Sequence, residues 1–408
     1  MRKILTLLAV SLCAAACIYP YTPELEEAPE GVLTVDGNIS IGDVSTVRLG
    51  SLRPLWPSET TPKSPNLRKA DVWVEDEDGT KYPGKWESSG SSTSGDIIFP
   101  GYTEPYDASP TFTIHTEDAP ADRRYRLCVE ALDELYVSDW SDIAPAPVIR
   151  KIEFLCGEND DQVTVAVSVD GGDGGTGYLQ LSYDETWEFH AEYFPSFIVN
   201  TTSWEIQPGT PPGFEETWFY WCWRSADNHA VYPLDYSGMA EKGIASWPLT
   251  RFPRTDNRNH RRYCIRVKAK SLNDASYRFL KNLEQNTDGG DNLFTPTPGE
   301  IAGNLRCETD PERMILGYVT IGRTVWKRAF LDSRYYRDHA PSRAGIVYPT
   351  KANYPTVYYQ GYLPLFMNDH LDYDPAEEGE YGWGSRRCYD CVAAGGTKQK
   401  PDYWDQNE

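Results

Sequence analysis

Two cysteines near the end of the chain, Cys388 and Cys391, form a C-x-x-C motif. Such a pair can supply half of a zinc site, act as a redox couple or form structural disulfides. A zinc ribbon needs a second C-x-x-C, which the sequence lacks, and a thioredoxin-like pair begins a helix rather than lying in a Gly-rich tail. The motif therefore favours disulfides over zinc or redox chemistry.

The first residues indicate that these cysteines are exported from the reducing cytosol. A basic pair precedes an apolar run over residues 4–12, which has the length of a signal-peptide core and is too short to span a bilayer. The small residues 14–16 lead directly to Cys17, as in a bacterial lipobox. We predict a signal peptide over 1–16, lipids on Cys17 and a Pro- and Glu-rich spacer over 17–31, with an ordinary secretory signal cut near residue 16 as the alternative.

Export allows the terminal cysteines to be paired, because disulfides persist in oxidising compartments. We predict that Cys388 and Cys391 attach the tail to the body of the chain, with Cys222 and Cys307 as their partners. Four cysteines allow three connectivities, and the sequence does not choose among them.

Patterns that would indicate catalysis or metal binding are missing from the sequence. Its 6 His residues are scattered, and neither H-E-x-x-H nor G-x-S-x-G occurs. Asp184, Glu185 and Glu188 are the residue types that a β-sandwich hydrolase would use, but solvation of a strand edge explains them more simply. The acidic stretches 170–177 and 372–380 lack EF-hand spacing. We expect no enzymatic activity, cofactor or metal, and keep a hydrolase as the least favoured alternative.

An aromatic run within residues 212–224 is a candidate contact surface. Because side chains alternate across a strand, part of such a run must point outward. An outward aromatic face can bind a sugar, a peptide or a partner protein, whereas packing between two sheets is the competing explanation. The candidate residues in this run are Trp218, Tyr220, Trp221 and Trp223. A Tyr-rich region at 334–373 is the second candidate surface.

The elements that must position these residues are mostly strands. Alternating apolar and polar residues between 32 and 146 predict an N-terminal β-sandwich, and similar patterns predict a second β-rich domain over 147–408. A short amphipathic helix is expected near 274–285, with Asn273 or Asp274 as its N-cap. We therefore predict two Ig-like sandwich units, one short helix and an irregular C-terminal region stapled by disulfides.

The charge of the chain excludes one class of partner. It has 39 basic and 61 acidic residues, for a formal net charge of −22. A protein this acidic is repelled by nucleic acid and by anionic lipid surfaces. We therefore expect no nucleic-acid partner, and contact with a membrane through the N-terminal lipids alone.

Several stretches together resemble domain-of-unknown-function family 4249. They are "LTVDGNI", "YRLCVEA", "LFTPTPGEIAGNLRC" with "ILGYVT", and the closing "CYDCVAAGGTKQKPDYW". The family consists of Bacteroidota lipoproteins commonly encoded beside TonB-dependent outer-membrane transporters. The resemblance implies a lipid-anchored protein of the outer membrane that captures a ligand for such a transporter or assembles with it. We favour the cell-surface side of this membrane, with the periplasmic face as the alternative. A surface glycan-binding or adhesive module is the alternative function, and the ligand is unknown.

Overall fold

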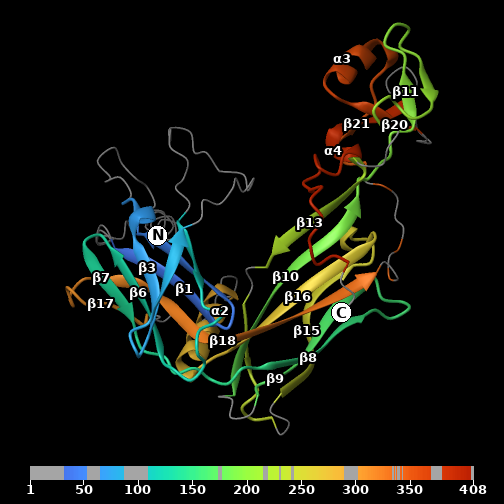
Figure 1. Ribbon diagram of the computed structural model, residues 1–408. Helices are drawn as coiled ribbons and strands as arrows, with labels where there is room; N and C mark the ends of the chain where they lie inside the picture. The colour runs from blue at the N-terminus through green and yellow to red at the C-terminus, as the bar shows by residue number, and fades with distance from the viewer. Residues whose placement is uncertain are drawn as a thin grey trace, which may run out of the picture.

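The computed structural model of the chain describes residues 32–52, 65–86, 109–172, 177–214, 219–228, 231–239, 243–288, 302–332, 335, 337, 341, 343–368 and 379–405. Strands dominate these residues and form two sandwich-like units, with a small head at one end of the second unit (Figure 1). The predicted fold class is confirmed. The predicted signal peptide, Cys17 and the spacer lie outside the described residues.

The N-terminal sandwich is built from short antiparallel strands whose alternate residues are apolar. In β1, Leu33, Val35 and Ile39 are buried while Asp36 and Asn38 are exposed, so alternation along the strand fills the core from one face. Full burial of each aliphatic side chain contributes about 1.5–3 kcal/mol. The elements of this unit are β1 (Leu33–Ile41), β2 (Val44–Ser51), η1 (Leu67–Lys69), β3 (Asp71–Asp76), β4 (Lys81–Trp86), β5 (Thr111–His115), β6 (Tyr125–Ala131), β7 (Glu134–Ser138) and β17 (Leu305–Cys307).

The second sandwich packs two sheets around a separate core. The inner residues of β9, Val163, Val165, Val167 and Val169, are fully buried against the opposing sheet. One sheet has the order β15-β9-β8, and the facing sheet has the order β13-β10-β16-β18 with β14 also paired to β10. The elements are β8 (Val148–Leu155), β9 (Gln162–Asp170), β10 (Tyr178–His190), β13 (Trp221–Asp227), β14 (Tyr232–Asp235), β15 (Gly243–Pro253), η3 (Asn257–Asn259), β16 (Arg262–Ser271) and β18 (Ile315–Asp332).

One long strand, β18, belongs to both sandwiches. Its residues 315–323 run parallel to β1, and its residues 324–332 run antiparallel to β16. The preceding strand β17 pairs with β7 of the N-terminal unit. The structure therefore differs from the predicted boundary after residue 146, since residues 305–323 return to the first sandwich. Local patterns do not reveal such long-range pairing.

A buried lysine closes the junction of the two sandwiches. Lys270, at the end of β16, donates hydrogen bonds to Asn38 Oδ1 (2.7 Å), Thr320 Oγ1 (2.8 Å) and the Thr320 carbonyl (3.0 Å). Burial lowers the pKa of Lys270 to about 7, and the nearby charge of Asp36 acts in the opposite direction. The ammonium group of Lys270 thus links β16 of the second sandwich to β1 and to the part of β18 that pairs with β1.

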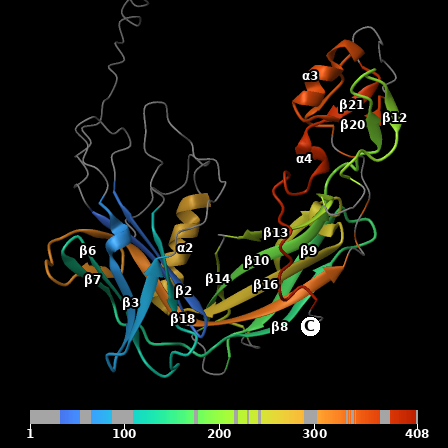
Figure 2. The same ribbon diagram turned by 45° about the horizontal axis from the view of Figure 1, so that its top comes forward.

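The longest helix of the described residues, α2 (Asp274–Asp288), lies between the two sandwiches (Figure 2). The Asn273 side chain caps it by accepting a hydrogen bond from the Ser276 backbone N–H at 2.8 Å, as predicted. Tyr277 stacks on Tyr178 of β10, and Phe279 stacks on Tyr318 of β18. The predicted helix is thus confirmed, and it packs against both halves of the molecule.

The head is a small unit with its own aromatic core. Trp383, Tyr354 and Tyr381 are buried there and pack against the hairpin β11–β12. The predicted irregular C-terminal region is therefore partly ordered into regular elements, because its aromatic residues meet a hairpin donated from residues 197–208. The elements are β11 (Phe197–Val199), β12 (Ile206–Pro208), β19 (Ile346–Val347), η5 (Lys351–Asn353), α3 (Tyr354–Tyr359), β20 (Leu363–Met367), β21 (Tyr381–Gly384) and α4 (Arg386–Tyr389).

Candidate functional site

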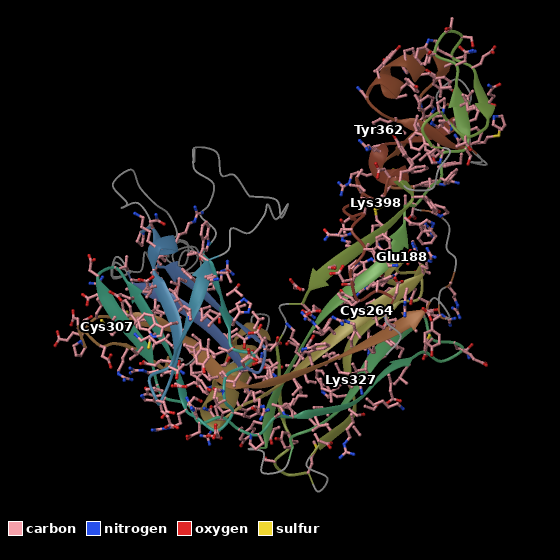
Figure 3. All side chains as sticks on the ribbon, in the orientation of Figure 1. Glu188, Cys264, Cys307, Lys327, Tyr362 and Lys398 are labelled. Atoms are coloured by element: carbon pink, nitrogen blue, oxygen red, sulfur yellow. A yellow bond between two sulfur atoms is a disulfide. The ribbon has the colours of Figure 1, made fainter. Side chains whose placement is uncertain are left out.

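One disulfide fixes the base of the head to the second sandwich. Cys222 of β13 is bonded to Cys391, across 169 residues of sequence. This bridge is among the predicted pairings, but the second predicted bridge is wrong, because Cys307 and Cys388 are free thiols. Cys307 lies on β17 in the N-terminal sandwich, far from the head, as Figure 3 shows. Its apolar surroundings and "GNLRC" pattern did not reveal which sandwich it joins.

After the disulfide, residues 391–405 form a strap across the outer face of the β13-β10-β16-β18 sheet. Thr397 exchanges two backbone hydrogen bonds with Trp223, at 2.7 and 2.9 Å. Further along, Trp404 is only 3% exposed, and its indole N–H donates to Glu188 at 3.4 Å. Its carbonyl accepts a hydrogen bond from Arg262 at 2.6 Å. The strap thus covers one end of this outer face with side chains from the same chain.

The strap limits how much of the predicted aromatic surface is exposed. Cys222 points into the core, so Trp221 and Trp223 on either side of it point to the outer face. Both are half-buried there, because Thr397 pairs with Trp223 and the Arg261 guanidinium lies over Trp221 at 5.3 Å. Tyr220 stacks on His190 at 4.9 Å between ring centroids. Trp218 lies outside the described residues, as do most of the acidic stretches considered for calcium.

The acidic residues considered for hydrolysis are separated and ion-paired. Asp184 and Glu188 share the outer face of β10 but lie four residues apart, which is about 13 Å along a strand. Catalytic carboxylate pairs are about 5–9.5 Å apart. Arg266 holds Asp184 at 2.7 Å, and Arg261 holds Glu188 at 2.7 Å. This arrangement gives no support to a glycosidase pair.

The third carboxylate, Glu185, points into the core. It accepts hydrogen bonds from the Tyr263 hydroxyl at 2.5 Å and from Arg258 at 3.3 Å. Burial first, and the adjacent Glu185 carboxylate second, raise the pKa of Tyr263 well above its ordinary value. Asp256 holds the other edge of the Arg258 guanidinium. This buried network is structural, because every charged member is satisfied by another.

The outer end of the head exposes aromatic rings. Tyr359, the last residue of α3, is 76% exposed. Its ring lies 5.8 Å from Tyr358 and 6.1 Å from Trp204 of the β11–β12 turn, measured between centroids. Trp204 has a φ of 58°, which is rare for a bulky residue and marks a strained turn held by its surroundings. We call Trp204, Tyr358 and Tyr359 the head tip.

The head tip combines one predicted and one missed feature. Tyr358 and Tyr359 belong to the Tyr-rich region that the sequence indicated, whereas Trp204 was not singled out. The turn signal around Trp204 is the Asn200 side chain, which accepts bonds from Thr202 and Ser203 at 2.9 and 3.1 Å. This pattern indicates a turn in the sequence, but only tertiary packing brings that turn beside α3.

The described ranges lack a metal-binding cluster and a membrane-spanning helix. No group of three or more His, Cys, Asp or Glu side chains is arranged there to hold a metal ion. None of the helices in this part of the chain combines the length and the apolar character needed to cross a bilayer.

Comparison with known protein families gives one match. The family model of the domain of unknown function DUF4249 matches residues 18–328. The chain belongs to this family. No curated protein matches it. The DUF4249 match includes both sandwiches as far as Arg328 of β18, so the head residues 346–391 and the strap lie beyond it. The terminal "CYDCVAAGGTKQKPDYW" that contributes to the resemblance is therefore outside the matched range.

Proposed function

We propose that this DUF4249 protein is a non-enzymatic lipoprotein that acts by contact with an outer-membrane transporter of the TonB-dependent class. In this proposal Cys17 carries the lipids, the sandwiches act as a rigid arm, and the head tip binds the transporter. The protein would be anchored in the outer membrane on its cell-surface side. It would either present a ligand to the transporter or take part in its assembly.

The head tip is the observation that carries this proposal. Aromatic side chains supply much of the binding energy in protein interfaces, and they do so at little cost in conformational entropy. Tyr359 has the largest exposed fraction, 76%, among the exposed large hydrophobic side chains of the described residues, and the Cys222–Cys391 disulfide fixes the head to the sandwich. A rigid arm that ends in an exposed tyrosine, supported by two half-buried rings, is suited to docking.

Site-specific crosslinking in intact cells tests the proposal. A photo-crosslinking amino acid at position 359 should capture a β-barrel transporter. The same amino acid at Met314, which is 53% exposed and precedes β18 on the N-terminal sandwich, is the matched control and should not capture it. Capture of soluble or periplasmic proteins alone, or equal capture from both positions, would refute the proposal and favour the adhesive alternative.

The remaining alternatives need separate readouts. A glycan-binding or adhesive module would retain surface binding in cells that lack the transporter. A hydrolase would show activity that is lost in Asp184→Asn and Glu188→Gln variants, and the ion pairs of both carboxylates make this the least favoured outcome. Replacing Cys17 by Ser should abolish incorporation of labelled fatty acid, which tests the anchor.

A further inference from the structure

The middle of the outer face of the β13-β10-β16-β18 sheet is not covered. The strap covers one end of this face, and the N-terminal sandwich closes the other end around Lys270. Between them, Trp326 of β18 is 48% exposed. It lies two residues beyond Thr324, which pairs with Lys270, so the uncovered patch begins at the junction of the sandwiches.

This uncovered patch concentrates positive charge in a chain whose net charge is −22. Arg328 lies directly opposite Arg266 across the β16–β18 pair, and Lys268 lies opposite Trp326. Like charges placed directly opposite each other across two strands are destabilising. Asp184 offsets part of this charge by binding Arg266 at 2.7 Å and Lys268 at 3.6 Å. The charge of Asp43, in the turn after β1, also acts on Arg266.

Arg328 is the member of the patch that lacks an acidic partner. Within the described ranges no carboxylate pairs with it, and its Nε is buried without a hydrogen-bond partner. By contrast, the half-buried Arg126, Arg258 and Arg266 each bind a carboxylate. Arg328 as a whole is half-buried, and a guanidinium with unused donors is well suited to receive a bidentate carboxylate from a ligand.

Two aromatic rings fix Arg328 in position. Its guanidinium lies 3.7 Å from the ring centroid of Tyr403 in the strap and 5.3 Å from that of Trp326. The Tyr403 hydroxyl is itself held by Thr186 of β10, at 2.9 Å. The donors of Arg328 are therefore held in place before any ligand arrives, and the exposed part of the Trp326 indole offers an apolar platform beside them.

We propose that this patch, made of Trp326, Arg328, Arg266 and Lys268, binds an acidic saccharide that contains uronic acid units. Arg328 would donate two hydrogen bonds to a uronate carboxylate, Trp326 would stack against the apolar face of a sugar ring, and Lys268 would meet a second carboxylate. The patch lies away from the head tip, so it is independent of the transporter contact proposed above.

Calorimetry on the detergent-solubilised full-length lipoprotein tests this site. The probes are a panel of uronate trisaccharides of different linkage, their methyl esters and an oligoglutamate peptide. At least one uronate should bind, and its ester, which keeps the rings and loses the charge, should bind at least about 10-fold more weakly. No binding by any uronate, or equal binding of acid and ester, would overturn the proposal. Equally tight binding of oligoglutamate would reassign the patch to acidic peptides and overturn it as well.

Variants locate the binding on the patch. Arg328→Met should weaken uronate binding at least about 10-fold, and Arg328→Lys should weaken it less, because a lysine keeps the charge without the bidentate geometry. Lys327→Met is the matched control. It removes one positive charge from the neighbouring position on β18, which is labelled in Figure 3. Because side chains alternate along a strand, Lys327 points to the opposite face, where it donates to the Arg150 carbonyl at 3.1 Å. Trp326→Ala should weaken binding of both acid and ester, and unchanged binding in Arg328→Met would refute the site.

Discussion

The strap-covered end of the outer face of the second sandwich and the head tip are both rich in aromatic side chains, but the chain covers the first and exposes Tyr359 at the second. Trp223 pairs with Thr397 of the strap, and Trp404 is a buried residue of the strap itself, whereas Tyr359 of the head tip is exposed to solvent. The aromatic content of the sequence therefore does not distinguish the covered region from the exposed one. Which rings are available to a partner depends on where the last residues of the chain lie.

The two regions should also respond differently to mutation. The disulfide, the strap and the Lys270 junction join parts of the chain that are distant in sequence, so changes there should alter the free energy of unfolding. Tyr359 of the head tip is mostly exposed, so its replacement should alter partner capture more than stability. The predictions below test this separation, from the largest expected change in stability to the smallest.

Removing the disulfide should have the largest effect. The double variant Cys222→Ser/Cys391→Ser should lose about 2–5 kcal/mol of unfolding free energy in denaturant titrations, because the bridge closes a loop of 169 residues. Cys388→Ser is the control and should change stability by less than about 1 kcal/mol, since Cys388 is a free thiol. Equal losses in both variants would show that Cys388 shares in the bridge.

Loosening the strap should have the next largest effect. Trp404→Ala should cost about 3 kcal/mol, because the indole is buried beside Phe330 and Glu188. Hydrogen exchange at the Trp223–Thr397 pair should accelerate in this variant. Trp326→Ala is the comparison on the same face and should cost less, since Trp326 is half exposed. An unchanged exchange rate at Thr397 would contradict the assignment of Trp404 as the anchor of the strap.

The Lys270 junction should make stability depend on pH. Because burial lowers the folded pKa of Lys270 to about 7, and an unfolded lysine titrates near 10.4, the unfolded chain binds more protons between these values. Stability from this group should therefore rise with pH across that window, by about 1 kcal/mol per pH unit, and stay constant below pH 7. Unfolding of wild type and Lys270→Met at several pH values measures it; parallel curves would show that Lys270 does not titrate there.

Truncating the head tip should change stability least. Tyr359→Ala removes a ring that is mostly in solvent, so the unfolding free energy should change by less than about 0.5 kcal/mol. Recovery of the transporter after crosslinking through other exposed positions of the head should nevertheless fall at least about 10-fold, because interface aromatics often contribute 1.4 kcal/mol or more. A large loss of stability would mean that Tyr359 supports the head core instead.

Much of the fold could be predicted because its signals are local. Alternation in residues 33–41 and 162–170 gave strands with one buried face, and Asn273 marked the start of α2. The return of residues 305–323 to the first sandwich could not be predicted, since β18 is one continuous strand that changes partners without a change in its pattern.

The candidate sites were less accessible to sequence reasoning. Cys222 and Cys391 were correctly included among the bridged cysteines, but Cys307 could not be excluded until its strand was placed in the other sandwich. Trp204 and Arg328 carried no motif at all. Each gains its significance from what lies beside it: Tyr359 in one case, and the opposing Arg266 with Tyr403 in the other.

The sequence by itself determined the β-rich architecture, the capped helix and the attachment of the C-terminal tail, because alternation, capping and cysteine spacing act over a few residues. Tertiary structure alone decided which cysteines form the bridge, which aromatic rings are exposed and that no carboxylate of the described residues pairs with Arg328. These depend on contacts between residues more than a hundred positions apart, such as Trp223 with Thr397 and Lys270 with Asn38. No local pattern contains that information, since burial and pairing are properties of the assembled sheets.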